Sequence, residues 1–139
     1  MSTEQNKKIV LRIFSEGMTE RKFQVFEELI SENFINHSFP NSQPGPKGFK
    51  AIIQQFTSAF PDMKISVQGI IAEGETVATR GSLSGTHKGE FMGIAATGKK
   101  VRIEYVDFWK LSSGKCVENW VQMDIAGVLQ QLESREHAL

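Results

Sequence analysis

The chain has 139 residues, the usual length of one domain, and 40% of them are hydrophobic, which is enough for a core and argues against disorder. Its 16 basic and 16 acidic residues cancel and are interspersed, so no charged surface attracts nucleic acid or an anionic membrane. The lone Cys116 cannot form an internal disulfide, and no segment has the apolar length of a secretion signal or a membrane helix. We expect one cytoplasmic domain over residues 1–139, with no nucleic-acid or membrane partner.

The first part of the chain has helical periodicity. Apolar residues recur at helical spacing from Thr3 to Glu16, with Ser2 or Thr3 as a possible N-cap and Gly17 as a stop. Two further helices are predicted, from Phe23 to Ile30 and from Phe49 to Phe56. Between them lie the segment 33–37 and a loop rich in Pro and Gly, residues 40–48.

After Pro61 the hydrophobic period changes to two, which predicts strands. The expected strands cover residues 65–70, 76–87, 101–109 and 116–124. A short helix from Ile125 to Leu132 closes the chain, and a polar tail follows in which His137 should be solvated. Helices first and antiparallel strands afterwards indicate an α+β domain whose helices cover one face of a meandering sheet.

Asp124 is the leading acid–base residue of the sequence. On the last strand Trp120, Gln122 and Asp124 share one face, because side chains alternate along a strand. If helices cover that face, burial raises the carboxyl pKa from about 4 toward the range useful for proton transfer. Alternatively, Asp124 simply caps the helix that begins at Ile125, and one acid could do both.

Two histidines each have a functional and a structural interpretation. His37 lies where a side chain could point into a cavity, and its ordinary pKa near 6.5 suits proton transfer. The alternative for His37 is a hydrogen bond to loop backbone. His87 ends a strand, where it could serve a pocket or be a surface turn residue.

The penultimate strand places Tyr105, Asp107 and Trp109 on one face. If this face is turned toward Asp124, two carboxyl groups and two indoles meet around one cavity; otherwise Asp107 faces solvent, and parity does not decide. Several phenylalanines could line a pocket for a flat molecule or belong to the core: Phe14, Phe26, Phe34, Phe56, Phe60 and Phe91. No phosphate-binding, dinucleotide-binding or metal-binding motif is present, so we expect chemistry without a metal or cofactor.

Four segments in this order resemble a known family over nearly the whole chain. They are residues 34–37, 59–62 and 84–99, and the Gly114-Lys115 turn with Trp120 and Asp124. Together they are similar to the SnoaL-like polyketide cyclases, or ester cyclases, of the nuclear transport factor 2-like superfamily. The resemblance implies a cone-shaped α+β barrel with a curved antiparallel sheet, N-terminal helices over a deep cavity, and a homodimer or higher homo-oligomer.

The same resemblance implies a mechanism. In these cyclases an aspartate equivalent to Asp124 is the general acid–base group of an intramolecular aldol condensation without a cofactor, and His37, His87 or Trp120 would supply a donor. This chain departs from the family at Ala95-Ala96, where proline is common, and at Trp109, where the family has arginine.

Two functions follow as hypotheses. The first is a cofactor-independent cyclase or isomerase acting on a small polycyclic or carbonyl-containing apolar substrate; a steroid-isomerase-like or epoxide-hydrolase-like activity is a variant of it. The second is a non-catalytic module that binds a small apolar molecule. The expected catalytic residues are Asp124, His37 and His87. The expected substrate-binding residues are Trp120, Asp107, Trp109, Phe34, Phe56, Phe60, Gln122, Tyr105 and Phe91.

Overall fold

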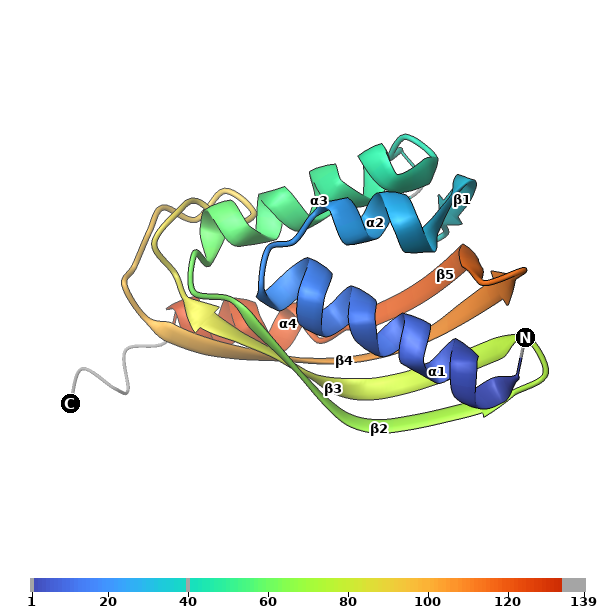
Figure 1. The fold of residues 1–139 in the computed structure, drawn as a ribbon. Coiled ribbons are helices and arrows are strands. Elements are labelled where there is room, and N and C mark those ends of the chain that lie inside the picture. Colours follow the sequence, from blue (N-terminus) through green and yellow to red (C-terminus); the bar gives the residue numbers. More distant parts are fainter. Residues whose placement is uncertain (1, 40, 134–139) are drawn as a thin grey trace.

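The structure, a computed structural model, describes residues 2–39 and 41–133, so His137 lies outside the described residues. The helical elements are α1 (Thr3–Arg12), η1 (Ile13–Thr19), α2 (Gln24–Leu29), α3 (Gly45–Ala59) and α4 (Ile125–Glu133). The strands are β1 (Ile30–Asn36), β2 (Lys64–Glu73), β3 (Thr76–Thr86), β4 (Lys100–Ser112) and β5 (Lys115–Met123). Figure 1 shows a curved sheet with α1, α2 and α3 over one face. The predicted α+β fold with N-terminal helices is confirmed.

The first helix begins as predicted but does not end at Gly17. The Ser2 hydroxyl accepts a hydrogen bond from the Gln5 backbone N–H at 3.1 Å, and the Gln5 side chain accepts one from the Ser2 N–H at 2.9 Å, which is a capping box. Past Arg12 the chain continues as the π-helical η1. A Cβ atom at Gly17 would lie 2.4 Å from the Phe26 ring, so this glycine permits close packing and does not stop the helix.

The sheet has the strand order β1-β5-β4-β3-β2. The pairs β2–β3, β3–β4 and β4–β5 are antiparallel, whereas β1 runs parallel to β5. The expectation of an antiparallel sheet is therefore wrong at β1. Between β1 and β5 the chain passes through α3, β2, β3 and β4 and then returns beside β1 in the same direction, which a parallel pair requires.

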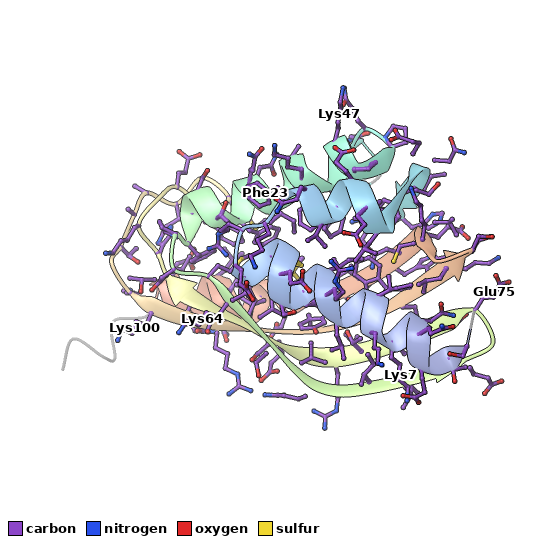
Figure 2. All side chains as sticks on the ribbon, in the orientation of Figure 1. Lys7, Phe23, Lys47, Lys64, Glu75 and Lys100 are labelled. Carbon is purple, nitrogen blue, oxygen red and sulfur yellow. The ribbon has the colours of Figure 1, made fainter. Side chains whose placement is uncertain are left out.

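Strand β4 shows which face of the sheet is covered. Its side chains alternate without exception between buried and exposed, and the buried set is Val101, Ile103, Tyr105, Asp107, Trp109 and Leu111. Trp109 packs against the rings of Phe14, Phe34 and Phe49 from the helices and β1. In contrast, the labelled Lys7, Lys47, Lys64, Glu75 and Lys100 extend away from the body of the protein (Figure 2). We call the covered side of the sheet the inner face and the opposite side the outer face.

Across residues 2–39 and 41–133, none of the helices combines the length and the apolar character that crossing a membrane requires.

Candidate functional site

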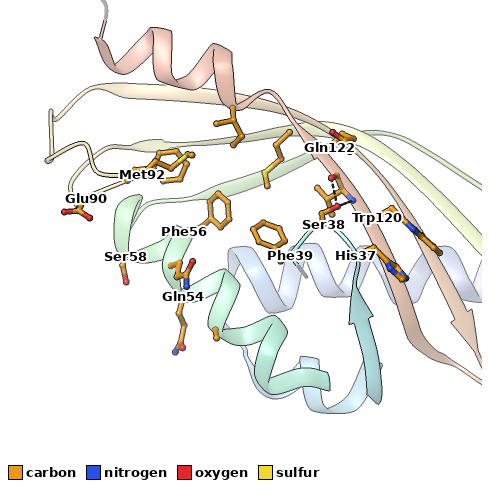
Figure 3. Close-up of a pocket in the computed structure, with 16 residues that line it drawn as sticks. His37, Ser38, Phe39, Gln54, Phe56, Ser58, Glu90, Met92, Trp120 and Gln122 are labelled. Atoms are coloured by element: carbon orange, nitrogen blue, oxygen red, sulfur yellow. Dashed lines mark hydrogen bonds between the residues drawn. The ribbon is translucent and has the colours of Figure 1, made fainter. Parts of the chain in front are cut away.

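Two hollows lie between the helices and the sheet. The larger is an open groove of about 1010 Å³ bounded by α3, the segment 37–39, the segment 90–92 and the end of β5, and we call it the outer groove (Figure 3). Its wall is formed mainly by neutral polar and aromatic side chains: His37, Ser38, Phe39, Gln54, Gln55, Phe56, Ser58, Phe91, Met92, Trp120 and Gln122. Among the described residues, Glu90 is its one carboxylate, and no Lys or Arg lines it.

The smaller hollow, the inner cavity, has a volume of about 70 Å³ and lies over the inner face of the sheet. Apolar side chains from α3, η1 and β2 enclose it, and its polar members are Asn36, Tyr105, Asp107, Trp109 and Asn119. Four residues line both hollows and separate them: Phe39, Phe56, Val121 and Met123. Figure 3 shows the rings of Phe39 and Phe56 side by side in this wall.

Asp107 is the buried acid of the inner cavity. It is 6% exposed, and Thr79, directly opposite on β3, donates its hydroxyl to Asp107 Oδ1 at 2.5 Å. Burial raises the pKa of Asp107 to about 6, although the hydrogen bond from Thr79 and the nearby Trp109 indole favour the charged form. An acid with a pKa near neutrality is well matched to proton transfer.

Tyr105 extends this arrangement by one hydroxyl. Its oxygen lies 3.2 Å from Thr79 Oγ1, and burial raises the Tyr105 pKa to about 12. Thr79 has one proton, and when it donates that proton to ionised Asp107, the Tyr105 hydroxyl is left to donate to Thr79. Tyr105, Thr79 and Asp107 therefore form a continuous hydrogen-bonded chain inside the sheet.

The structure places Asp124 outside both hollows. Its side chain is exposed, lies on the outer face, and accepts a hydrogen bond from the Gly127 backbone N–H at 2.8 Å at the start of α4. The expectation that helices cover the face of β5 bearing Asp124 is therefore wrong: they cover the face with Asn119, Val121 and Met123. Of the two interpretations of Asp124, helix capping describes its contacts.

The contacts of Asp124 give a first prediction. Asp124→Ala should lower the free energy of unfolding by about 1 kcal/mol, because the first turn of α4 loses its cap. Asp124→Asn should be close to wild type, since asparagine caps equally well. Urea unfolding of both variants measures this, and a larger loss in Asp124→Asn than in Asp124→Ala would contradict the capping role.

His37 and Trp120 meet at the rim of the outer groove. Their rings stack with centroids 4.7 Å apart (Figure 3). His37 Nε2 also lies 3.0 Å from Glu118 Oε1. Trp120 is 41% exposed and Gln122 is exposed beside it, so these residues line the groove and not the inner cavity. Neither orientation left open for Asp107 is found: it does not meet Asp124 and does not face solvent, because Asp107 and Trp109 face inward while Asp124 and Trp120 face outward.

His87 lies in neither hollow and is not a surface turn residue. It is fully buried, with its Nδ1 accepting a hydrogen bond from the Thr97 backbone N–H at 3.2 Å and lying 2.9 Å from the Thr97 hydroxyl. Its ring packs against Phe60. His87 thus holds the segment 88–98 against the core, and the expectation of either a pocket or a surface position is wrong.

The predicted phenylalanines divide between hollow and core. Phe56 and Phe91 line the outer groove, and Phe56 also lines the inner cavity. Phe34 and Phe60 line neither hollow: Phe34 packs on Trp109 and Phe49, and Phe60 packs on His87 and Phe91. The sequence interpretation missed Asn36, Phe39, Thr79, Asn119 and Met123.

In the part of the chain that the structure describes, no three acidic, histidine or cysteine side chains gather closely enough to hold a metal ion.

The comparison with protein families agrees with the fold and with the segments quoted above. The sequence profile described as SnoaL-like polyketide cyclase matches residues 8–132. The chain belongs to this family. A comparison with curated protein sequences gives no significant match.

Solved structures of other proteins superpose on almost the entire chain. IdmH of Streptomyces antibioticus, a candidate polyketide cyclase, is 28% identical with a TM-score of 0.81, covering 94% of this chain and 99% of its own. AclR of Streptomyces galilaeus, a candidate hydroxylase, is 27% identical with a TM-score of 0.83, covering 94% and 97%. TsrD of Streptomyces laurentii has a TM-score of 0.88 at 20% identity over 96% and 98%, which concerns the fold alone.

Proposed function

We propose that this SnoaL-like protein is a cofactor-independent cyclase or isomerase whose acid–base group is Asp107. The observation that carries the proposal is the position of Asp107, which among the described residues is the one charged side chain lining the inner cavity. A buried carboxyl with a pKa of about 6 is partly ionised near neutral pH, so it can both accept and return a proton.

The reaction would start with proton removal. The Asp107 carboxylate accepts a proton from a carbon next to a substrate carbonyl, and the C–H electron pair moves into an enolate. In an isomerase the proton returns to a different carbon. In a cyclase the enolate carbon attacks a second carbonyl of the same molecule, a C–C bond forms, and protonated Asp107 gives its proton to the new alkoxide. Burial away from water favours each step.

Substrate entry requires the wall between the hollows to move. Pockets for drug-sized ligands are about 300–1,000 Å³, far above the 70 Å³ of the inner cavity. Displacement of Phe39 and Phe56 would join the cavity to the outer groove, because both rings line both hollows. A polycyclic carbonyl compound would then reach Asp107 with one ring while the rest of the molecule occupies the groove.

Deuterium exchange tests the proposal without knowledge of the natural substrate. The bicyclic ketone 1-tetralone carries acidic hydrogens beside its carbonyl, and NMR in D₂O follows their replacement. We expect the folded protein to accelerate exchange over heat-denatured protein at equal concentration. Exchange at the same rate in both samples, repeated with a 1,3-diketone, would count against acid–base catalysis.

A non-catalytic role as a binding module is the second candidate. It is favoured by the small volume of the inner cavity and by its lining, which is mostly apolar. Native mass spectrometry of protein purified from its own host separates the two roles. A retained apolar molecule that is recovered unchanged after prolonged incubation supports binding alone.

We also infer that the protein forms a homodimer through the outer face of its sheet. Val106, Phe108 and Trp120 are 53%, 54% and 41% exposed there, and Phe108 lies directly opposite Trp120 on the neighbouring strand. A second copy would bury this apolar patch, which a monomer leaves in water.

Sedimentation equilibrium measures this association. Wild type should show twice the chain mass, and Phe108→Glu should show the chain mass because a buried charge opposes association. Glu75→Lys, a charge change in the β2–β3 turn, is the control and should remain dimeric. A monomeric wild type, or a dimeric Phe108→Glu variant, would exclude this interface.

A further inference from the structure

Two buried polar atoms beside Asp107 make no hydrogen bond of ordinary geometry. They are the indole Nε1 of Trp109 and the amide oxygen Oδ1 of Asn119. Trp109 and Asn119 lie directly opposite each other on β4 and β5, and both line the inner cavity. Trp109 is 1% exposed and Asn119 is fully buried. Buried polar atoms nearly always have a hydrogen-bond partner in folded proteins, so two atoms without a full hydrogen bond in one cavity require a physical explanation.

The two atoms have opposite hydrogen-bonding character. The Trp109 N–H can only donate, whereas the Asn119 oxygen can only accept. The orientation of the Asn119 amide follows from its other end, since Nδ2 donates to the Phe108 carbonyl at 3.4 Å. A reversed amide would place its oxygen against that carbonyl oxygen, so Oδ1 is the atom left without a partner.

We propose that Trp109 and Asn119 are the oxygen-binding pair of the inner cavity: Trp109 donates to a ligand carbonyl, and Asn119 accepts from a neighbouring ligand hydroxyl. The ligand is then a hydroxy ketone or an enolised 1,3-diketone. This inference deepens the proposed function and rests on it for the reaction, while the binding of the two oxygens can be tested alone.

The pair would also fit the chemistry of Asp107. Asp107 and Trp109 are separated by one residue on the same face of β4, and the indole N–H acts on the carboxylate as a weak donor that lowers the Asp107 pKa, although its geometry falls short of a full hydrogen bond. When Asp107 removes a proton beside the carbonyl, negative charge develops on the carbonyl oxygen, which is where an N–H donor is most effective. Trp109 would thus bind the enolate oxygen, and Asn119 would orient the second oxygen.

Asn119 supplies selectivity against ligands without a donor. A ligand that presents a second carbonyl, ether or ester oxygen to Oδ1 would place two acceptors together in a buried cavity, which costs binding free energy. Among the described residues, no Lys or Arg lines the outer groove. The part of the ligand that lies in this groove is therefore not expected to be an anion. The preferred ligand class is therefore a neutral carbonyl compound with one free or enolic hydroxyl.

Acetylacetone and its methyl enol ether are a matched pair of probes, because only acetylacetone has the enolic hydroxyl. Binding is followed by ligand-observed NMR in every protein, and also by the NMR signal of the Trp109 indole N–H in the proteins that keep Trp109. We expect wild type to bind acetylacetone about tenfold more tightly than the ether, a difference typical of one buried hydrogen bond. Asn119→Leu should abolish that preference, and Trp109→Phe should weaken binding of both probes about tenfold.

Thermal unfolding separates a binding role from a structural one. Asn119→Leu keeps the branched shape of the side chain and removes an unpaired buried acceptor together with the long hydrogen bond to the Phe108 carbonyl, so we expect its Tm to stay at or above that of wild type. The control Asn33→Leu makes the same change at an exposed position of β1 and should keep the probe preference. No binding of acetylacetone by wild type, equal affinity for both probes, or a preference that survives in Asn119→Leu would each overturn the inference. These results do not depend on whether Asp107 transfers protons.

Discussion

Asp107→Asn should slow the catalysed exchange of α-hydrogens by about 10²–10⁴-fold, the usual contribution of a positioned acid–base group. Asparagine keeps the size of the side chain and can still accept from Thr79, but it cannot take a proton. The wild-type rate should rise with pH through about 6, because the carboxylate is the active form of the base. NMR exchange rates of 1-tetralone in D₂O from pH 5 to pH 8 give both results.

Asp124→Asn is the matched control for this experiment. It makes the same chemical change at the exposed cap of α4, outside both hollows, and should keep the wild-type exchange rate. If Asp107→Asn exchanged at the wild-type rate, or if Asp124→Asn lost the activity, the inner cavity would not be the site of proton transfer.

The buried Asp107 should also make the protein less stable as the pH rises from about 4 to about 6. The carboxyl has its ordinary pKa of 3.8 in the unfolded chain and a pKa of about 6 in the folded protein. Between these values the folded state holds more protons than the unfolded state, so the free energy of unfolding falls with increasing pH and levels off above 6. The difference corresponds to about 3 kcal/mol as an order of magnitude.

Urea unfolding at pH 4 and pH 7 of wild type and Asp107→Asn measures this contribution. The variant cannot ionise at this position, so its stability should change less between the two pH values, and at pH 7 it should be more stable than wild type. Other carboxylates affect both proteins equally and cancel in the comparison. A variant less stable than wild type at pH 7 would mean that ionised Asp107 stabilises the fold.

Strand β4 shows how much of the site is encoded locally. Its strict alternation predicts that Tyr105, Asp107 and Trp109 share one face, and the structure confirms it. Asp107 is the only charged residue on an otherwise apolar set of alternate positions, which is itself a signal of a buried acid. What one strand cannot provide is the identity of its neighbours, so the pairing of Asp107 with Thr79 follows only from the register of β3.

Strand β5 shows where interpretation of the sequence fails. Alternation separates residues 118–123 correctly, although an irregularity before them turns Cys116 inward. The presence of an indole and an acid favours the set with Trp120 and Asp124 for the covered face, which is wrong. The opposite set includes Val121 and Met123, and that apolar content is the better guide to the covered face. Asn119 belongs to this apolar set, where it stands out as a polar residue facing the core.

The Ser38 side chain, in the wall of the outer groove, also affects how this protein interacts with other chains. Strand β1 ends at Asn36, and beyond it the Ser38 hydroxyl both accepts from the Val121 N–H and donates to the Val121 carbonyl, each at 2.7 Å. Unpaired backbone groups at the edge of a sheet can pair with a strand of another molecule, and such pairing starts aggregation. Because the Ser38 hydroxyl pairs with both the N–H and the carbonyl of Val121, these two backbone groups cannot pair with another chain. The outer groove beside them stays open to small molecules.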